Sequence, residues 1–174
     1  YDPDQAGRYE KGFVERSRRL HREGRVLYLD ASGGGLLQML GVGDWESLKA
    51  ACHALVREPR KVAELVEKTI DFYCSCLDRA LPKVTVDYAS FYEPIASNIG
   101  PVISSKMFER FAIPGYRKIN DLLKTYHVPL RILCTTGGDL TSLLPYLIDA
   151  GINGLWISNI KSARMEYGKL RQRF

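Results

Sequence analysis

The sequence has few cysteines and histidines, the residues that form disulfides and bind structural metals in small folds. Its 174 residues include four cysteines and three histidines. Cys74 and Cys76 stand two positions apart within a helical pattern, where their side chains point in different directions. No histidine has the His-x-Cys or His-Glu-x-x-His spacing of a zinc site. We therefore expect free thiols, no zinc, and no other recognisable cofactor-binding motif.

Long apolar runs and a leader segment are also missing. No run approaches the roughly 20 residues that cross a bilayer, and Tyr1–Asp4 lacks the basic and then apolar regions of a signal peptide. The net charge of +5 is spread along the chain, so neither a membrane nor a nucleic acid is favoured as a partner. With 45% hydrophobic and 26% charged residues, the composition predicts a cytoplasmic protein with one domain over residues 1–174.

What the chain does contain is an alternation of strand and helix patterns. Helical patterns are predicted within 2–24, from Gly43 onward, over 60–81, from Ser104 with a kink at Pro114, and over 140–150 and 161–173. Between them lie short apolar segments, at 25–30, 83–88, 128–134 and 153–158. Crossovers of this length join parallel strands, so the pattern predicts an α/β fold.

In such a fold ligands bind at the carboxyl ends of the strands. Glu93 lies in the longest predicted loop, 89–100, among aromatic and apolar residues. A desolvated carboxyl there would have a raised pKa suited to proton transfer, whereas a solvated loop acid would be ordinary. We take Glu93 as the candidate catalytic residue.

Three further candidates for substrate binding follow the first two strands. Asp30 ends the first strand and can contact a ligand or cap the turn. Gly34 lies in the Gly33–Gly35 turn, which lets backbone amides approach a ligand but lacks the third glycine of a dinucleotide fingerprint. A tight turn is the simpler interpretation. Tyr88 can donate a hydrogen bond or pack in an aromatic cluster.

The loop after the third strand supplies the next candidates, which are Thr135, Thr136, Gly138 and Asp139. Hydroxyls and glycines before a helix can hold a carboxylate or phosphate. The same residues can equally form a turn with Asp139 as the helix cap.

Several segments, taken in order, resemble the uroporphyrinogen decarboxylase-like superfamily over nearly the whole chain. They are 2–9, 33–35, 40–41, 58–59, 93–111 with Pro114 and Tyr116, 138–145 and 149–155. The resemblance implies a (β/α)8 TIM barrel. Members of the superfamily include the cofactor-independent decarboxylase of porphyrin biosynthesis, and methyltransferases that use corrinoid carriers or coenzyme M, several with zinc.

The segment around Glu93 is more similar to the methyltransferase-like branch. The resemblance thus implies an enzyme that moves a methyl group between a small methylated substrate and a corrinoid on a partner protein. The alternatives are uroporphyrinogen decarboxylation and a non-catalytic binding or assembly module. Relatives carry ionisable groups where this chain has Thr135, Gly137 and Asn159, which motivates the last alternative and makes Asn159 a candidate substrate-binding residue.

The length constrains the expected barrel. An eight-unit barrel typically needs about 250 residues, and four strands are predicted in these 174 residues. We therefore expect a partial barrel of about four βα units. Such a chain is either a piece of a larger barrel or closes its sheet by pairing with a second copy as a homodimer.

Overall fold

The computed structural model describes the chain except residues 1, 98, 136, 158–164 and 174. Its centre is a parallel sheet of four strands, in the order β1 (Tyr28–Asp30), β2 (Tyr88–Tyr92), β5 (Leu130–Thr135) and β6 (Gly154–Ile157). Spatial order thus follows chain order, as in successive βα units of a barrel. The predicted α/β fold is confirmed as a partial barrel, and the described residues form no closed one.

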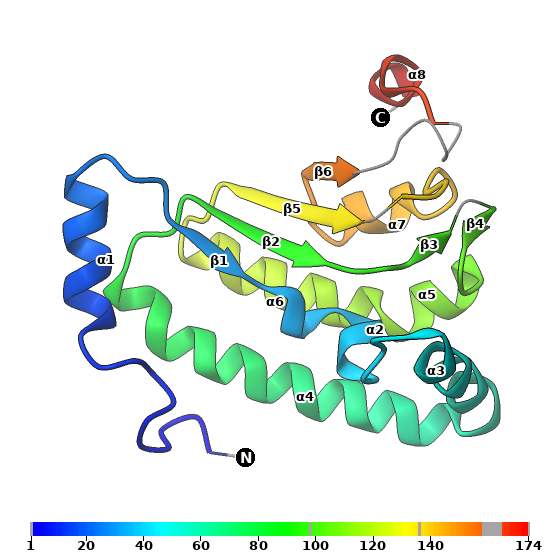
Figure 1. Cartoon of the computed structure of the whole chain (residues 1–174), viewed down its shortest axis with the longest axis horizontal. Coiled ribbons are helices and arrows are strands. Elements are labelled where there is room, and N and C mark those ends of the chain that lie inside the picture. The colour runs from blue at the N-terminus through cyan, green and yellow to red at the C-terminus, as the bar shows by residue number, and fades with distance from the viewer. Residues whose placement is uncertain (1, 98, 136, 158–164, 174) are drawn as a thin grey trace.

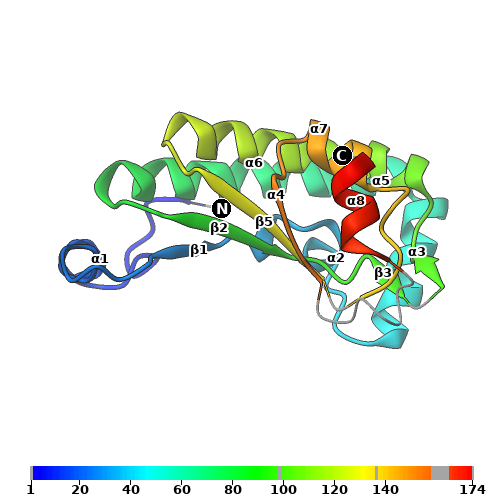
Figure 2. The same cartoon turned by 90° about the horizontal axis from the view of Figure 1, so that it is seen from above.

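Helices cover one face of this sheet. Figures 1 and 2 show α4 and α6 behind the strands, with α7 beside them, while no described helix covers the front of the sheet. The helices are α1 (Phe13–Arg22), α2 (Leu36–Met39), α3 (Trp45–Arg57), α4 (Pro59–Ala80), α5 (Ser105–Phe111), α6 (Ile113–Thr125), α7 (Leu144–Asp149) and α8 (Tyr167–Arg173). None of the described helices combines the length and the apolar character needed to cross a membrane.

Local sequence explains where the main helices begin. Pro59 starts α4, where its missing N–H costs nothing. Asp44 and Ser47 form a capping box before α3. The kink predicted at Pro114 is a helix boundary: α5 ends at Phe111, and α6 begins at Ile113 with Pro114 in its first turn.

Two predicted boundaries are wrong. The second strand was expected at 83–88, but residues 81–83 form a 3₁₀ turn and the strand runs from Tyr88 to Tyr92. Asp87 sets this start, because its carboxylate accepts a hydrogen bond from the N–H of Leu27 at 2.6 Å and its own N–H donates to the Leu27 carbonyl at 2.8 Å. The helix expected from 140 begins only at Leu144.

The rest of the expected 89–100 loop also has structure. It contains a short antiparallel hairpin of β3 (Ala96–Ser97) and β4 (Gly100–Pro101). This hairpin lies beyond the carboxyl end of β2, beside α5 (Figure 1).

Candidate functional site

The uncovered side of the sheet, here called the open face, presents three rows of side chains that cross the strands. Strand register defines the rows, because alternate residues of a strand point to the same side. From the amino to the carboxyl end they are Tyr28–Tyr88–Leu130, then Asp30–Ser90–Ile132–Gly154, then Tyr92–Cys134–Trp156. The middle row therefore has small or polar side chains at its β1 end, and the two outer rows place aromatic residues on both sides of it.

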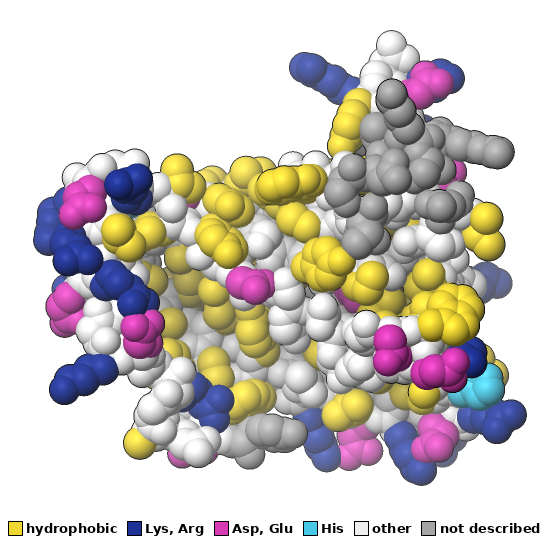
Figure 3. Space-filling model, in the orientation of Figure 1, with side chains coloured by type: hydrophobic (Ala, Val, Ile, Leu, Met, Phe, Trp, Pro, Cys, Tyr) yellow, Lys and Arg dark blue, Asp and Glu magenta, His cyan; other side chains and the backbone are white. Residues whose placement is uncertain are grey.

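Large apolar side chains are exposed on the open face. Tyr28 is 59% exposed, Tyr92 41% and Trp156 64%. The rings of Tyr28 and Tyr88 stack with centroids 5.4 Å apart. Figure 3 shows apolar side chains spread over the strands, whereas Lys and Arg lie around the edges of this view, several of them near α1. An exposed patch of this kind marks an interaction surface.

Asp30 is the acidic residue of the open face. Its Oδ1 accepts the N–H of Ser32 at 2.9 Å, which holds the turn after β1, and Ser32 Oγ in turn accepts the N–H of Tyr92 at 3.1 Å. Among the described residues no Lys or Arg forms an ion pair with Asp30, in contrast to Asp71, which pairs with Lys118 at 2.5 Å. Burial raises the pKa of Cys134, and the Asp30 charge adds to that rise.

Glu93 lies on the other, helix-covered side. It follows β2 directly and is fully buried. Its Oε2 accepts the N–H of Leu36 at 2.8 Å and the hydroxyl of Tyr116 at 2.6 Å, and its Oε1 accepts the N–H of Leu37 at 2.6 Å. Burial raises the pKa of Glu93 to about 7, against the lowering effect of these three hydrogen bonds.

This arrangement makes Glu93 a clamp on the turn that follows β1. Its carboxylate holds the first N–H groups of α2, and Tyr116 fixes the carboxylate from α6. A Cβ on Gly35 would lie 2.6 Å from Glu93 Oε2, and one on Gly34 would overlap the end of Ile119. Both glycines therefore permit close packing, and the tight-turn interpretation of Gly34 has direct structural support.

The predicted anion loop is packed into the protein rather than open to the sheet face. Thr135 is buried and on the same side as Glu93. Gly138 has a φ of 93°, and a Cβ there would overlap the backbone of Ser97. Asp139 is exposed and accepts the N–H of Thr141 at 2.8 Å, which caps a turn ahead of α7.

The structure therefore divides the predicted site residues. Asp30 and Tyr88 come together on the open face, and Glu93, Gly34, Thr135 and Gly138 lie within the packed side. Thr136 and Asn159 lie outside the described residues. Sequence reasoning left Ser90, Cys134 and Trp156 unselected. Their signal was the alternation of the strands, and for Ser90 the misplaced second strand concealed it.

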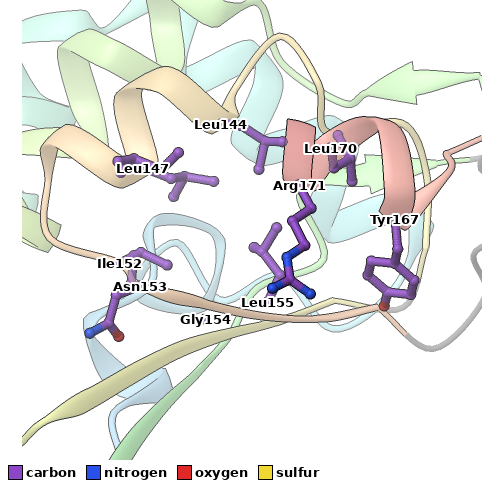
Figure 4. Close-up of a pocket in the computed structure, with 10 residues that line it drawn as sticks. Leu144, Leu147, Ile152, Asn153, Gly154, Leu155, Tyr167, Leu170 and Arg171 are labelled. Carbon is purple, nitrogen blue, oxygen red and sulfur yellow. The ribbon is translucent and has the colours of Figure 1, made fainter. Parts of the chain in front are cut away.

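The described residues offer no metal site beside these side chains. No group of three or more His, Cys, Asp or Glu side chains lies together there as a metal site requires. A groove of about 540 Å³ lies between α7, β6 and α8, lined mostly by leucine and isoleucine, with Tyr167 and Arg171 of α8 at its side (Figure 4). Gly154 of the middle row lines it, whereas none of the described residues that were predicted for the site does.

Comparison with known proteins identifies one family. No curated protein and no solved structure matches the chain. The family model of uroporphyrinogen decarboxylase (URO-D) matches residues 37–172, which include β2, β5, β6 and every helix except α1 and part of α2 and α8. The chain belongs to the uroporphyrinogen decarboxylase family.

Proposed function

We propose that this chain is a methyl-transferring member of its family, which binds a small methylated substrate on the open face for transfer to a corrinoid carried by a partner protein. One observation carries the proposal: within the four described strands, the open face bears one charge, and that charge is negative. Asp30 and Arg131 are the charged residues within the four strands.

Arg131 cannot serve as a cation for a ligand there. Its position pairs with Ala89, which is buried on the covered side. Its guanidinium donates to the carbonyls of Val128 and Gly151, both at 2.8 Å, near the amino end of β5. Asp30 thus has no basic counterpart in the described strands.

This charge distribution argues against uroporphyrinogen, the alternative substrate. Uroporphyrinogen carries several carboxylates, and a site for it needs basic side chains or clustered N–H donors. The described strands present one carboxylate and neutral aromatic rings on this face, which disfavours the binding of such a molecule. The face accepts a neutral or cationic substrate, which methylated small molecules commonly are.

In methyl transfer the reduced corrinoid on the partner would supply the nucleophile that takes the methyl group, and the substrate heteroatom keeps the electron pair of the broken bond. The contribution of this chain is to hold and orient the substrate. Tyr92 and Trp156 shield it from water at the carboxyl end, and Asp30 sets its charge preference. Glu93 positions the turn that carries Ser32. In this proposal Glu93 acts through that turn and does not itself donate a proton to the substrate.

Binding without turnover is the second candidate. Both carboxylate oxygens of Glu93 already accept hydrogen bonds from protein donors on the covered side. No buried acid therefore remains for proton transfer on the described part of the open face, which favours this candidate.

The test is to mix the chain with reduced free cobalamin, which stands in for the partner's corrinoid, and with a methylated amine, a methoxyaromatic compound or uroporphyrinogen. Formation of methylcobalamin, followed by absorbance, is expected with a methylated compound, and its rate should fall in Asp30→Asn. Binding of a methylated compound without methyl transfer would support the second candidate. Decarboxylation of uroporphyrinogen would overturn the proposal.

A further inference from the structure

The middle row of the open face holds one carboxylate, that of Asp30. Some exposed acids of this protein form ion pairs, among them Asp4 with Arg79 and Asp149 with Arg117. Asp30 has the N–H of Ser32 on one oxygen, and no Lys or Arg pairs with it among the described residues. A carboxylate kept without a cation on an apolar face is an electrostatic complement for a cationic ligand.

Aromatic side chains surround this carboxylate on two sides. Tyr28 precedes Asp30 by two positions on β1, so it lies about 7 Å away along the strand. Tyr88 and Tyr92 flank Ser90, the residue paired with Asp30, and lie about 8 Å from Asp30 on the diagonals. Ser90 is small, and beyond it Ile132 and Gly154 continue the row. Asp30 and Ser90, with the tyrosines on both sides of them, are here called the Asp30 strip.

We propose that the Asp30 strip binds a small methylated ammonium ion, with Asp30 facing its charge and the tyrosines of β1 and β2 contacting its methyl groups. Methylated ammonium ions are weakly hydrated, and aromatic rings with a carboxylate are the side chains that recognise them. Neutral methoxyaromatic compounds would leave Asp30 without a partner. This inference rests on the proposed function, because it names the substrate class of the same site.

The experiment is a calorimetric titration of the whole chain with tetramethylammonium and choline, and with 3,3-dimethylbutanol, the neutral isostere of choline. We expect choline to bind about fivefold or more tightly than the isostere, and added salt to weaken choline alone. Asp30→Asn keeps an oxygen for the Ser32 N–H, so the turn is retained, and should remove the difference between choline and its isostere.

Two variants act as controls. Asp121→Asn makes the same charge change on the exposed surface of α6, where Asp121 pairs with Lys124, and should leave choline binding unchanged. Tyr88→Phe keeps the ring and should retain binding, whereas Tyr88→Leu removes the ring and should weaken choline about fivefold.

Equal affinity for choline and its isostere, or equal loss in Asp30→Asn and Asp121→Asn, would overturn the inference. So would binding that weakens as the protein self-associates in sedimentation, since a second copy would then occupy the open face. Because the titration contains no corrinoid, its outcome is separate from that of the methyl-transfer assay. Transfer from a methoxyaromatic without choline binding would leave the proposed function standing and refute this inference alone.

Discussion

The two faces of the sheet are built from the same strands and differ in what their side chains do. On the covered face, Phe91 and Leu133 are fully buried and Glu93 has a protein donor at each oxygen. On the open face, Tyr92 and Trp156 are exposed and Asp30 has no basic partner among the described residues. The comparison teaches that the most conspicuous acid of the sequence belongs to the architecture, whereas a less conspicuous one faces the space available to a ligand.

The sharpest test of this comparison removes one carboxylate from each face. Glu93→Ala leaves two backbone N–H groups and the Tyr116 hydroxyl buried without their acceptor, and should lower the free energy of unfolding by about 3–5 kcal/mol. Asp30→Ala leaves the N–H of Ser32 exposed to water and should lower the free energy of unfolding by about 1 kcal/mol or less. Urea denaturation measures both, and similar costs for the two variants would contradict the assignment.

The pH dependence of stability separates the faces next. The pKa of Glu93 is raised to about 7 in the folded protein from an ordinary value of 4.5, so the folded state binds this proton more tightly than the unfolded chain does. The free energy of unfolding should therefore fall as pH rises from about 4.5 to 7, by about 3 kcal/mol for this group.

Glu93→Gln is the matched variant for this measurement, because it cannot titrate. The difference in unfolding free energy between the wild type and Glu93→Gln should change across the pH 4.5–7 window. The carboxylates of Glu10 and Glu64 have lowered pKa values, so their contributions change below that window and cancel in the difference. A difference that is flat with pH would show that Glu93 is already ionised in the folded state at pH 4.5.

Hydroxyl deletions give the smallest expected contrast. Tyr116→Phe removes a buried donor from Glu93 and should cost about 1–2 kcal/mol. Tyr92→Phe removes a hydroxyl from the partly exposed ring on the open face and should change stability by less than about 0.5 kcal/mol. Thermal unfolding of the two variants compares them directly, and a larger loss for Tyr92→Phe would reverse the roles of the faces.

Much of the covered face could be predicted from the sequence. The helical spacing of Val62, Val66 and Ile70 places α4, whose predicted and observed bounds differ by one residue at each end. The strand patterns located β1, β5 and β6 because each is a short apolar run between turn residues.

The open face was harder to predict because it depends on register. The β-branched run at 84–86 favours a strand, but the bonds between Asp87 and Leu27 place that run before the sheet begins. This shift left Ser90 and Tyr92 in a predicted loop. The burial of Glu93 could not be predicted from its neighbours in the sequence either, since the N–H groups that bind it lie 57 and 56 residues earlier in the chain.

Mapping a ligand onto the sheet tests the central claim most directly. In a titration with tetramethylammonium followed by amide chemical shifts, we expect the largest changes at Asp30, Ser90 and Tyr92 on the open face, and none in the helix layer at α4 and α6. Changes centred on the groove between α7, β6 and α8, or on the surroundings of Glu93, would contradict the claim that the open face is the binding face.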